Sequence, residues 1–212
     1  MKSKKIELLE EVANYYSNKL SLHGETPRGV DWNGEESQIL RFSQLCKIIN
    51  AAVHDSFSLT DIGCGYGALL DYLHDNYSGY SYLGVDVSED MINAAKSRYS
   101  AIHRARFIKA PQPDCEADYS IASGIFNVRL GRSDEEWYEY LLNTLDMLSS
   151  SSRIGFAFNC LTSYSDKDKK RDYLYYADPC RLFDLCKRRY SGQVALLHDY
   201  GLYEFTILVR KS

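Results

Sequence analysis

The sequence lacks the patterns typical of membrane proteins and of metal-dependent proteins. It has no run of about 18 apolar residues, so no membrane span is expected, and its basic N-terminus continues into an amphipathic helix without a signal-peptide core. The six cysteines form no C-x-x-C pair, and the five histidines are dispersed. These absences argue against a zinc cage, another metal site or a disulfide framework, and they favour a cytoplasmic protein with reduced thiols.

An excess of positive charge is also missing. The net charge is −4 and the sequence pI is about 5.8, and the short basic runs 2–5 and 167–171 are interpreted as solvated faces. We therefore expect no nucleic-acid partner. The 212 residues suffice for one domain with a substantial core, and they contain no internal repeat or low-complexity tract.

The stretch 59–70, LTDIGCGYGALL, is the most informative part of the chain. It predicts the end of a buried strand, a glycine-rich turn that leaves room for a ligand, and the start of a helix. Asp61, directly before the glycines, would repel a pyrophosphate but attract a ligand that carries an ammonium group. A second strand over 80–88 ends near Asp86, where a carboxylate can accept both hydroxyls of a ribose.

This D-x-G-x-G-x-G pattern, followed by a strand that ends in an acid, resembles the first motifs of the class I (Rossmann-like) S-adenosylmethionine-dependent methyltransferases. The resemblance implies S-adenosylmethionine (SAM) as cofactor, with Asp61 and the glycine loop at its methionine portion. Asp86 would hold the ribose, and Val87 and Met91 would pack on the adenine. Small residues after the fourth strand leave room for the ligand, and Arg41 is a candidate for pairing with a carboxylate. The cofactor-binding residues that we predict are Asp61, Gly63, Cys64, Gly65, Tyr66, Gly67, Asp86, Val87, Met91, Ser123, Gly124 and Arg41. One departure from the family is Ala110-Pro111-Gln112 after the third strand, where an acid is usual.

The order of elements predicts a three-layer Rossmann-like fold. We expect a seven-stranded, mostly parallel sheet with an antiparallel last strand and an N-terminal helical extension. Strands are predicted near 105–110, 118–122, 153–160, 193–200 and 202–210, and helices near 4–20, 36–52, 68–77 and 134–148. Few residues link the last two strands, so they should pair as an antiparallel hairpin, which is the class I methyltransferase topology. The predicted organisation is a helical cap over 1–54 and a SAM-binding domain over 55–212.

Two other functions remain open at this stage. Gly63-x-Gly65-x-x-Ala68 also matches the dinucleotide fingerprint, in which case Asp86 would hold the ribose of NAD in an oxidoreductase. Asp61 and the terminal hairpin disfavour that interpretation. A methyltransferase-fold protein could also use SAM for aminocarboxypropyl transfer, or bind ligand without turnover, and the motifs do not separate these possibilities.

For the methyl acceptor, we predict a small polar metabolite such as a sugar or nucleotide-sugar, bound by a monomer or homodimer. Trp32 either covers the ligand or plugs the domain edge, and the tyrosine-rich insert 161–178 either walls the pocket or packs its own aromatics. His198, near the end of the sixth strand, is a candidate base or a structural histidine, and Asn127 is a second catalytic candidate. The predicted substrate-binding residues are Trp32, Asn127, Asn159, Tyr164, Tyr175 and Tyr176.

Overall fold

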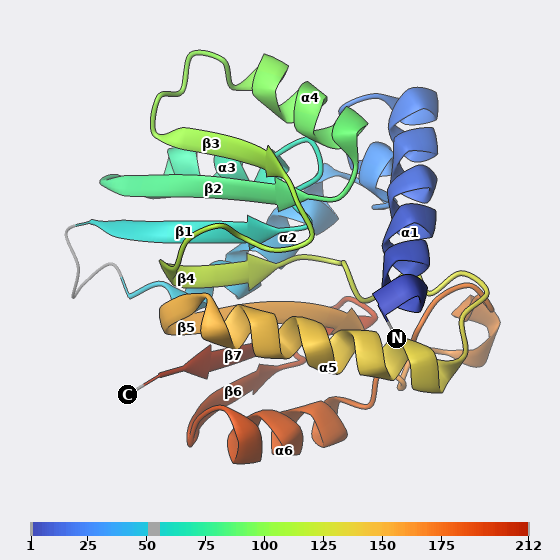
Figure 1. Ribbon diagram of the computed structural model, residues 1–212. Coiled ribbons are helices and arrows are strands. Elements are labelled where there is room, and N and C mark those ends of the chain that lie inside the picture. The colour runs from blue at the N-terminus through green and yellow to red at the C-terminus, as the bar shows by residue number, and fades with distance from the viewer. Residues whose placement is uncertain (1, 51–55, 212) are drawn as a thin grey trace.

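The computed structural model describes residues 2–50 and 56–211, and it has one central sheet with helices on both faces (Figure 1). The strands are β1 (Phe57–Ile62), β2 (Tyr80–Asp86), β3 (Ala105–Lys109), β4 (Ala117–Ala122), β5 (Ser152–Leu161), β6 (Gln193–Leu197) and β7 (Glu204–Arg210). The helices are α1 (Lys2–His23), α2 (Glu35–Leu45), α3 (Ala68–Asn76), α4 (Glu89–Arg98), α5 (Asp134–Ser150) and α6 (Pro179–Arg189). Short 3₁₀ turns are η1 (Pro27–Val30), η2 (Cys46–Ile48) and η3 (Lys167–Lys169). Within these described ranges, no helix is long and apolar enough to cross a membrane.

The sheet has the predicted topology. Its strand order is β3-β2-β1-β4-β5-β7-β6. Strand β7 runs antiparallel to both β5 and β6, whereas the other neighbouring strands pair in parallel. The predicted Rossmann-like fold with an antiparallel last strand is confirmed. Because the strand order reverses between β1 and β4, a crevice opens at their carboxyl ends, where ligands of such sheets bind.

Two apolar layers hold the helices to the sheet. On one face of the sheet, α2, α3 and α4 contribute to a core that includes Leu45, Leu59 and Leu73. On the other face, α5 and α6 contribute to a core that includes Leu141 and Phe156. Along β5, Phe156 and Phe158 face α5 and α6, whereas Ala157 faces the opposite side. This alternation is the period-2 pattern of a strand covered on both faces.

Side-chain caps begin three of the helices. Ser88 accepts from the Met91 N–H at the start of α4, and Ser133 accepts from the Glu136 N–H at the start of α5. The Asp178 carboxylate accepts from two N–H groups at the start of α6, and Pro179 follows it at a position that needs no donor. These bonds satisfy N–H groups that a helix start leaves without partners.

Helix α2 is shorter than predicted. It ends at Leu45, and the chain tightens into η2 before Ile49 takes an extended conformation. The apolar spacing of Leu45 and Ile48 also fits a 3₁₀ turn, so periodicity alone did not locate this change. Residues 51–52 of the predicted helix and the predicted boundary between 54 and 55 lie outside the described residues.

One strand end also differs from expectation, and one connection is unusually direct. Strand β6 ends at Leu197 rather than near Tyr200, so His198 lies beyond the strand. Strand β3 joins β4 directly through residues 110–116, without an intervening helix. This link contains Pro111 and Pro113, which lack the N–H groups that a helix needs.

Helix α1 lies across the carboxyl ends of the central strands (Figure 1). The Tyr15 hydroxyl and the Lys19 ammonium each donate to Asp31 over 2.7 Å, which attaches the helix to the loop after η1. The hydroxyls of Ser17 and Ser88 are 2.9 Å apart, which joins α1 to the start of α4. The helix therefore forms a roof over the crevice between β1 and β4.

Candidate active site

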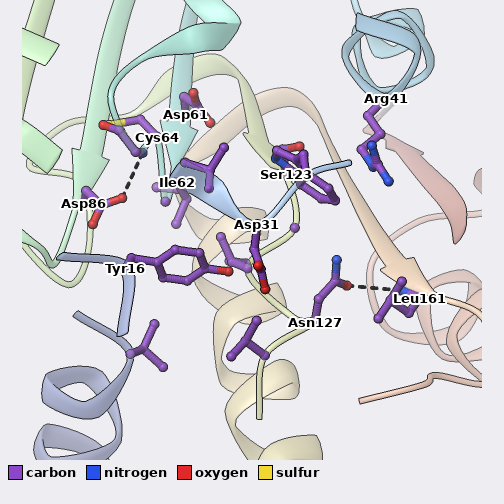
Figure 2. Close-up of a pocket in the computed structure, with 18 of the residues that line it drawn as sticks. Tyr16, Asp31, Arg41, Asp61, Ile62, Cys64, Asp86, Ser123, Asn127 and Leu161 are labelled. Atoms are coloured by element: carbon purple, nitrogen blue, oxygen red, sulfur yellow. Dashed lines mark hydrogen bonds between the residues drawn. The ribbon is translucent and has the colours of Figure 1, made fainter. Parts of the chain in front are cut away.

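A cavity of about 580 Å³ occupies this crevice. Its floor is the glycine loop after β1 together with the ends of β2 and β4. Its roof and far wall come from α1, the loop after η1, α2 and the insert 161–178 (Figure 2). Ala110, Pro111 and Gln112, which stand where the family usually carries an acid, also line it.

The glycine loop is folded tightly onto β2. Gly63, Gly65 and Gly67 have φ values of 72°, 54° and 87°, a region that favours glycine. A Cβ on Gly63 would lie 2.2 Å from the Ile125 side chain. The N–H groups of Gly63 and Cys64 donate to the Val85 carbonyl, and the Gly65 N–H donates to Asp86. These three N–H groups are therefore already hydrogen-bonded within the protein. The glycine loop therefore provides space for a ligand in the cavity, but these three N–H groups are not available as donors to it.

Asp61 presents an unpaired oxygen at the cavity floor. The Tyr82 hydroxyl donates to its Oδ2 over 2.7 Å, whereas its buried Oδ1 finds no donor among the described residues. The pKa of Asp61 is raised to about 7, mainly by burial and also by the nearby Asp86 carboxylate, whereas the hydrogen bond from Tyr82 opposes the rise. The buried Ser123 hydroxyl is likewise without a described partner and lines the same cavity. Unpaired buried polar atoms are uncommon in folded proteins, and two of the four found in the described residues belong to residues that line this cavity.

Asp86 is fixed by two backbone donors. The Gly65 N–H donates to Oδ2 over 2.9 Å (Figure 2), and the Ser88 N–H donates to Oδ1 over 2.8 Å. Burial raises the pKa of this carboxyl, and the backbone bonds oppose that rise. Each oxygen keeps acceptor capacity for a hydroxyl. Val87 and Met91 line the cavity beside it.

These groups fit the cofactor that the sequence predicts. An unpaired carboxylate oxygen suits an ammonium, a fixed carboxylate suits a ribose diol, and an apolar strip suits a base. Of the predicted cofactor residues, the described cavity is lined by all but Gly67. Gly67 instead lies where a Cβ would meet the Tyr99 ring at 2.7 Å.

A buried network joins the N-terminal segment to the last strand. The Arg41 guanidinium donates to both oxygens of Glu204 over 2.7 to 2.9 Å, and the two side chains are only 7% and 2% exposed. The Asn159 amide donates to Glu204 and accepts from the Gly124 N–H, each over 2.7 Å. Arg41 lines the cavity, but Glu204 already balances its charge. Asn159 lies behind the wall and braces it.

Trp32 is held between this network and β4. The Arg41 guanidinium lies 3.8 Å from the centre of the indole ring. Gly124 has a φ of 77°, and a Cβ there would lie 2.4 Å from the ring. The absence of a side chain at Gly124 therefore lets Trp32 pack against the end of β4 and form part of the cavity wall.

Asn127 and Asp31 project toward the middle of the cavity (Figure 2). The Leu161 N–H donates to the Asn127 Oδ1 over 3.1 Å, which turns the amide nitrogen toward the cavity. Asp31 has a φ of 64°, which is unusual for a residue with a side chain, and its carboxylate is held by Tyr15 and Lys19. An amide donor and an ionic acceptor thus face the same space.

Of the other residues predicted for the acceptor end, some line the cavity and some do not. Tyr176 lines the cavity, whereas Tyr164, Tyr175 and His198 do not. The His198 ring lies against the rings of Tyr164 and Phe205. Tyr175 packs on the core beneath α5 and α6, and burial raises its pKa to about 12.

The cavity also contains residues that the sequence did not single out as site residues. Tyr16 points into it from α1, and Asp31 is next to the predicted Trp32. The polar and aromatic residues that gather in the loop around Trp32 could have indicated Asp31 as a site residue. No local pattern indicates Tyr16, which occupies an ordinary position on an amphipathic helix. Further lining residues of this kind are Gln38, Tyr140, Asn143, Thr144 and Tyr173.

The sheet order, the glycine loop and the two carboxylates define a class I methyltransferase. A family model described as a methyltransferase domain matches residues 60–150. The chain is 64% identical, over 166 residues, to the Mycobacterium tuberculosis (strain ATCC 25618 / H37Rv) protein named "Putative methyltransferase Rv1506c". That match covers 78% of this chain and 99% of the relative. The chain therefore belongs to the class I SAM-dependent methyltransferase family.

Solved structures share the fold at low sequence identity. Magnesium protoporphyrin IX methyltransferase from Synechocystis PCC 6803, with bound SAM, aligns with a TM-score of 0.57 and 14% identity, covering 83% of this chain and 82% of that one. The DhpI-SAM-HEP complex aligns with a TM-score of 0.63 and 12% identity, covering 97% of this chain and 98% of that one.

Replacing Arg41 tests the buried network. Arg41→Met leaves the Glu204 carboxylate buried without its cation, so we expect the free energy of unfolding in urea to fall by about 3 to 5 kcal/mol. The double variant Arg41→Met/Glu204→Met removes both charges and should regain much of that loss. A double variant no more stable than Arg41→Met would contradict the assignment.

The raised pKa of Asp61 predicts a dependence of stability on pH. The pKa is about 7 in the folded protein and about 3.9 in an unfolded chain, so the folded state binds its proton more tightly. Stability from this group is complete below pH ~4 and is lost as pH rises through 7, by up to about 4 kcal/mol. Urea unfolding between pH ~4 and ~8 should show this loss relative to Asp61→Asn. Parallel profiles of the two proteins would argue against a buried, unpaired carboxyl.

Proposed function

We propose that the protein binds SAM in this cavity and transfers the methyl group to a small polar metabolite, such as a sugar or nucleotide-sugar. The observation that carries the proposal is the pairing of Asp61, with its unpaired buried oxygen, and Asp86 at one end of a single cavity. The other end is lined by amides, hydroxyls and tyrosines, which suit an acceptor with several polar groups.

SAM supplies a methyl group on a positively charged sulfonium, which an acceptor takes by direct in-line displacement. In this proposal the Asp61 Oδ1 accepts from the ammonium of the cofactor, and Asp86 accepts from its ribose hydroxyls. Val87 and Met91 pack against the adenine. Trp32 and α1 exclude water from the centre of the cavity, where electrostatic interactions are stronger than in water.

Asp31 and Asn127 orient the acceptor. The Asp31 carboxylate accepts a hydrogen bond from the reacting hydroxyl, and it takes the hydroxyl proton as the oxygen–methyl bond forms and S-adenosylhomocysteine leaves. The Asn127 amide nitrogen donates to a neighbouring oxygen. Both side chains are fixed, Asp31 by Tyr15 and Lys19 and Asn127 by the Leu161 N–H. Holding an acceptor near its attack position is the main contribution that a protein can make to such a displacement. His198, which the sequence offered as a base, does not line the cavity and is given no catalytic role in this proposal.

Titration calorimetry with S-adenosylhomocysteine, with NAD run alongside, tests the cofactor site. Wild type should bind the first and not the second. Asp61→Ala removes the ammonium acceptor, and Gly63→Ala places a Cβ 2.2 Å from Ile125 at a φ of 72°. Each variant should weaken binding about tenfold or more.

Gly192→Ala is the matched control, because no atom lies within 4 Å of the added Cβ. Far-UV dichroism should stay unchanged in all three variants. Normal binding by both site variants would place the cofactor elsewhere. In turnover, methylthioadenosine as product in place of S-adenosylhomocysteine would indicate aminocarboxypropyl transfer.

Asp31→Asn tests the acceptor end. It keeps the shape of the side chain but weakens the acceptor for the reacting hydroxyl, so kcat should fall by about 10²-fold while the affinity for S-adenosylhomocysteine is retained. The assay uses whichever sugar or nucleotide-sugar of a panel accepts the methyl group. His198→Asn serves as control and should leave kcat unchanged. A larger effect at His198 than at Asp31 would reverse these roles.

A further inference from the structure

The charges around the cavity are unequally distributed. Among the described residues, three basic side chains line it: Arg41, Lys169 and Arg171. Arg41 is neutralised by Glu204 within the wall. Lys169 and Arg171 both come from the insert, whereas Asp61 and Asp86 stand at the opposite, cofactor end. The cavity therefore has an acidic end and a basic end.

The insert is fixed beside the acceptor end by backbone bonds. The N–H groups of Arg129 and Leu130 both donate to the Tyr173 carbonyl over 3.0 Å, and the Tyr175 N–H donates to the Asn127 carbonyl over 2.8 Å. The basic segment is thus held alongside the stretch that begins with Asn127. Its position follows from these bonds and does not depend on a ligand.

Arg171 has donors to spare. Its backbone N–H donates to the Tyr176 hydroxyl, and its Nη1 donates to the carbonyls of Asp168 and Lys170, each over 3.0 Å. In the described part of the chain its guanidinium has no ion-pair partner. The Nε and Nη2 groups therefore remain available to a ligand, in a planar arrangement that matches the oxygens of a carboxylate or phosphate.

Lys169 is only loosely paired. Its ammonium lies 3.4 Å from Asp168, and these side chains are 57% and 73% exposed. Such exposed pairs contribute little, so an incoming anion can replace Asp168 easily. The adjacent Lys170 is different, because its ammonium donates to the Ser163 carbonyl and lies over the Tyr176 ring.

We propose that Lys169 and Arg171 form a subsite for an anionic group, a phosphate or a carboxylate, on the methyl acceptor. This inference rests on the proposed function and narrows its substrate class to acceptors that carry such a group. The subsite sets the direction of binding. The anion is attracted to the insert and repelled by Asp61 and Asp86, which leaves the hydroxyl part of the acceptor between Asp31 and Asn127.

Small anions test the subsite without knowledge of the full acceptor. The thermal unfolding midpoint is measured at constant ionic strength against increasing methyl phosphate, acetate or, as the neutral probe, glycerol. Methyl phosphate, acetate or both should raise the midpoint of the wild type in a saturable way, and the two arms tell phosphate from carboxylate. Lys169→Gln/Arg171→Gln should weaken the apparent affinity about tenfold or more.

The matched control is Lys167→Gln/Arg188→Gln. It removes the same two kinds of charge from exposed positions outside the cavity, and it should respond as the wild type does. Equal responses of the wild type and the Lys169→Gln/Arg171→Gln variant, or no response of the wild type to either anion, would overturn the subsite. Binding of S-adenosylhomocysteine is measured separately on each protein and should be unchanged. A wild type that does not bind S-adenosylhomocysteine would count against the proposed function and not against the subsite.

Discussion

The buried ion pair between Arg41 and Glu204 is the interaction on which the shape of the cavity depends. It joins α2, which precedes the first strand, to β7, the last one, and no water-exposed pair could fix that distance so firmly. Its charges are removed from water, so each requires the other and the Asn159 amide as well. Trp32 packs between the Arg41 guanidinium and Gly124, and the Gly124 N–H donates to Asn159 of the same network. The N-terminal segment is therefore a wall of the cavity, attached to β7, which lies three strands along the sheet from β1 and its glycine loop.

The cofactor end carries a different kind of constraint. Asp61 is buried with one oxygen satisfied by Tyr82 and the other left open. Without a ligand, the folded state relieves this by holding a proton, which is why the pKa rises to about 7. A cationic ligand removes the need for the proton and lets the carboxylate ionise. In the proposed complex, binding of the cofactor's ammonium would therefore release a proton from this residue near neutral pH.

Much of the fold was predictable because local sequence patterns determine it. The glycine turn, the caps at Ser88, Ser133 and Asp178, and the short link before β7 each act over a few residues. The cofactor loop belongs to this class, and most of its predicted residues meet at one cavity. The network around Glu204 was not predictable from local patterns. Its partner Arg41 is 163 positions away, and the strand pattern of β7 gives no sign of a buried acid. The place of His198 depends on where β6 ends: the strand stops three residues earlier than expected, and the His198 ring lies against Phe205 and does not line the cavity.

The chemistry at the acceptor end follows from how Asp31 is held. Lys19 balances the charge of the Asp31 carboxylate, and Lys19 and Tyr15 each occupy one acceptor site on a different carboxylate oxygen. Each oxygen keeps acceptor capacity in a fixed direction, so the proposed role of Asp31 is to align the reacting hydroxyl and to take its proton during transfer. The sulfonium already carries a good leaving group, so alignment of the acceptor is the main requirement that remains for the protein. The left-handed backbone at Asp31 is then a conformation that the loop adopts in order to place this carboxylate opposite Asn127.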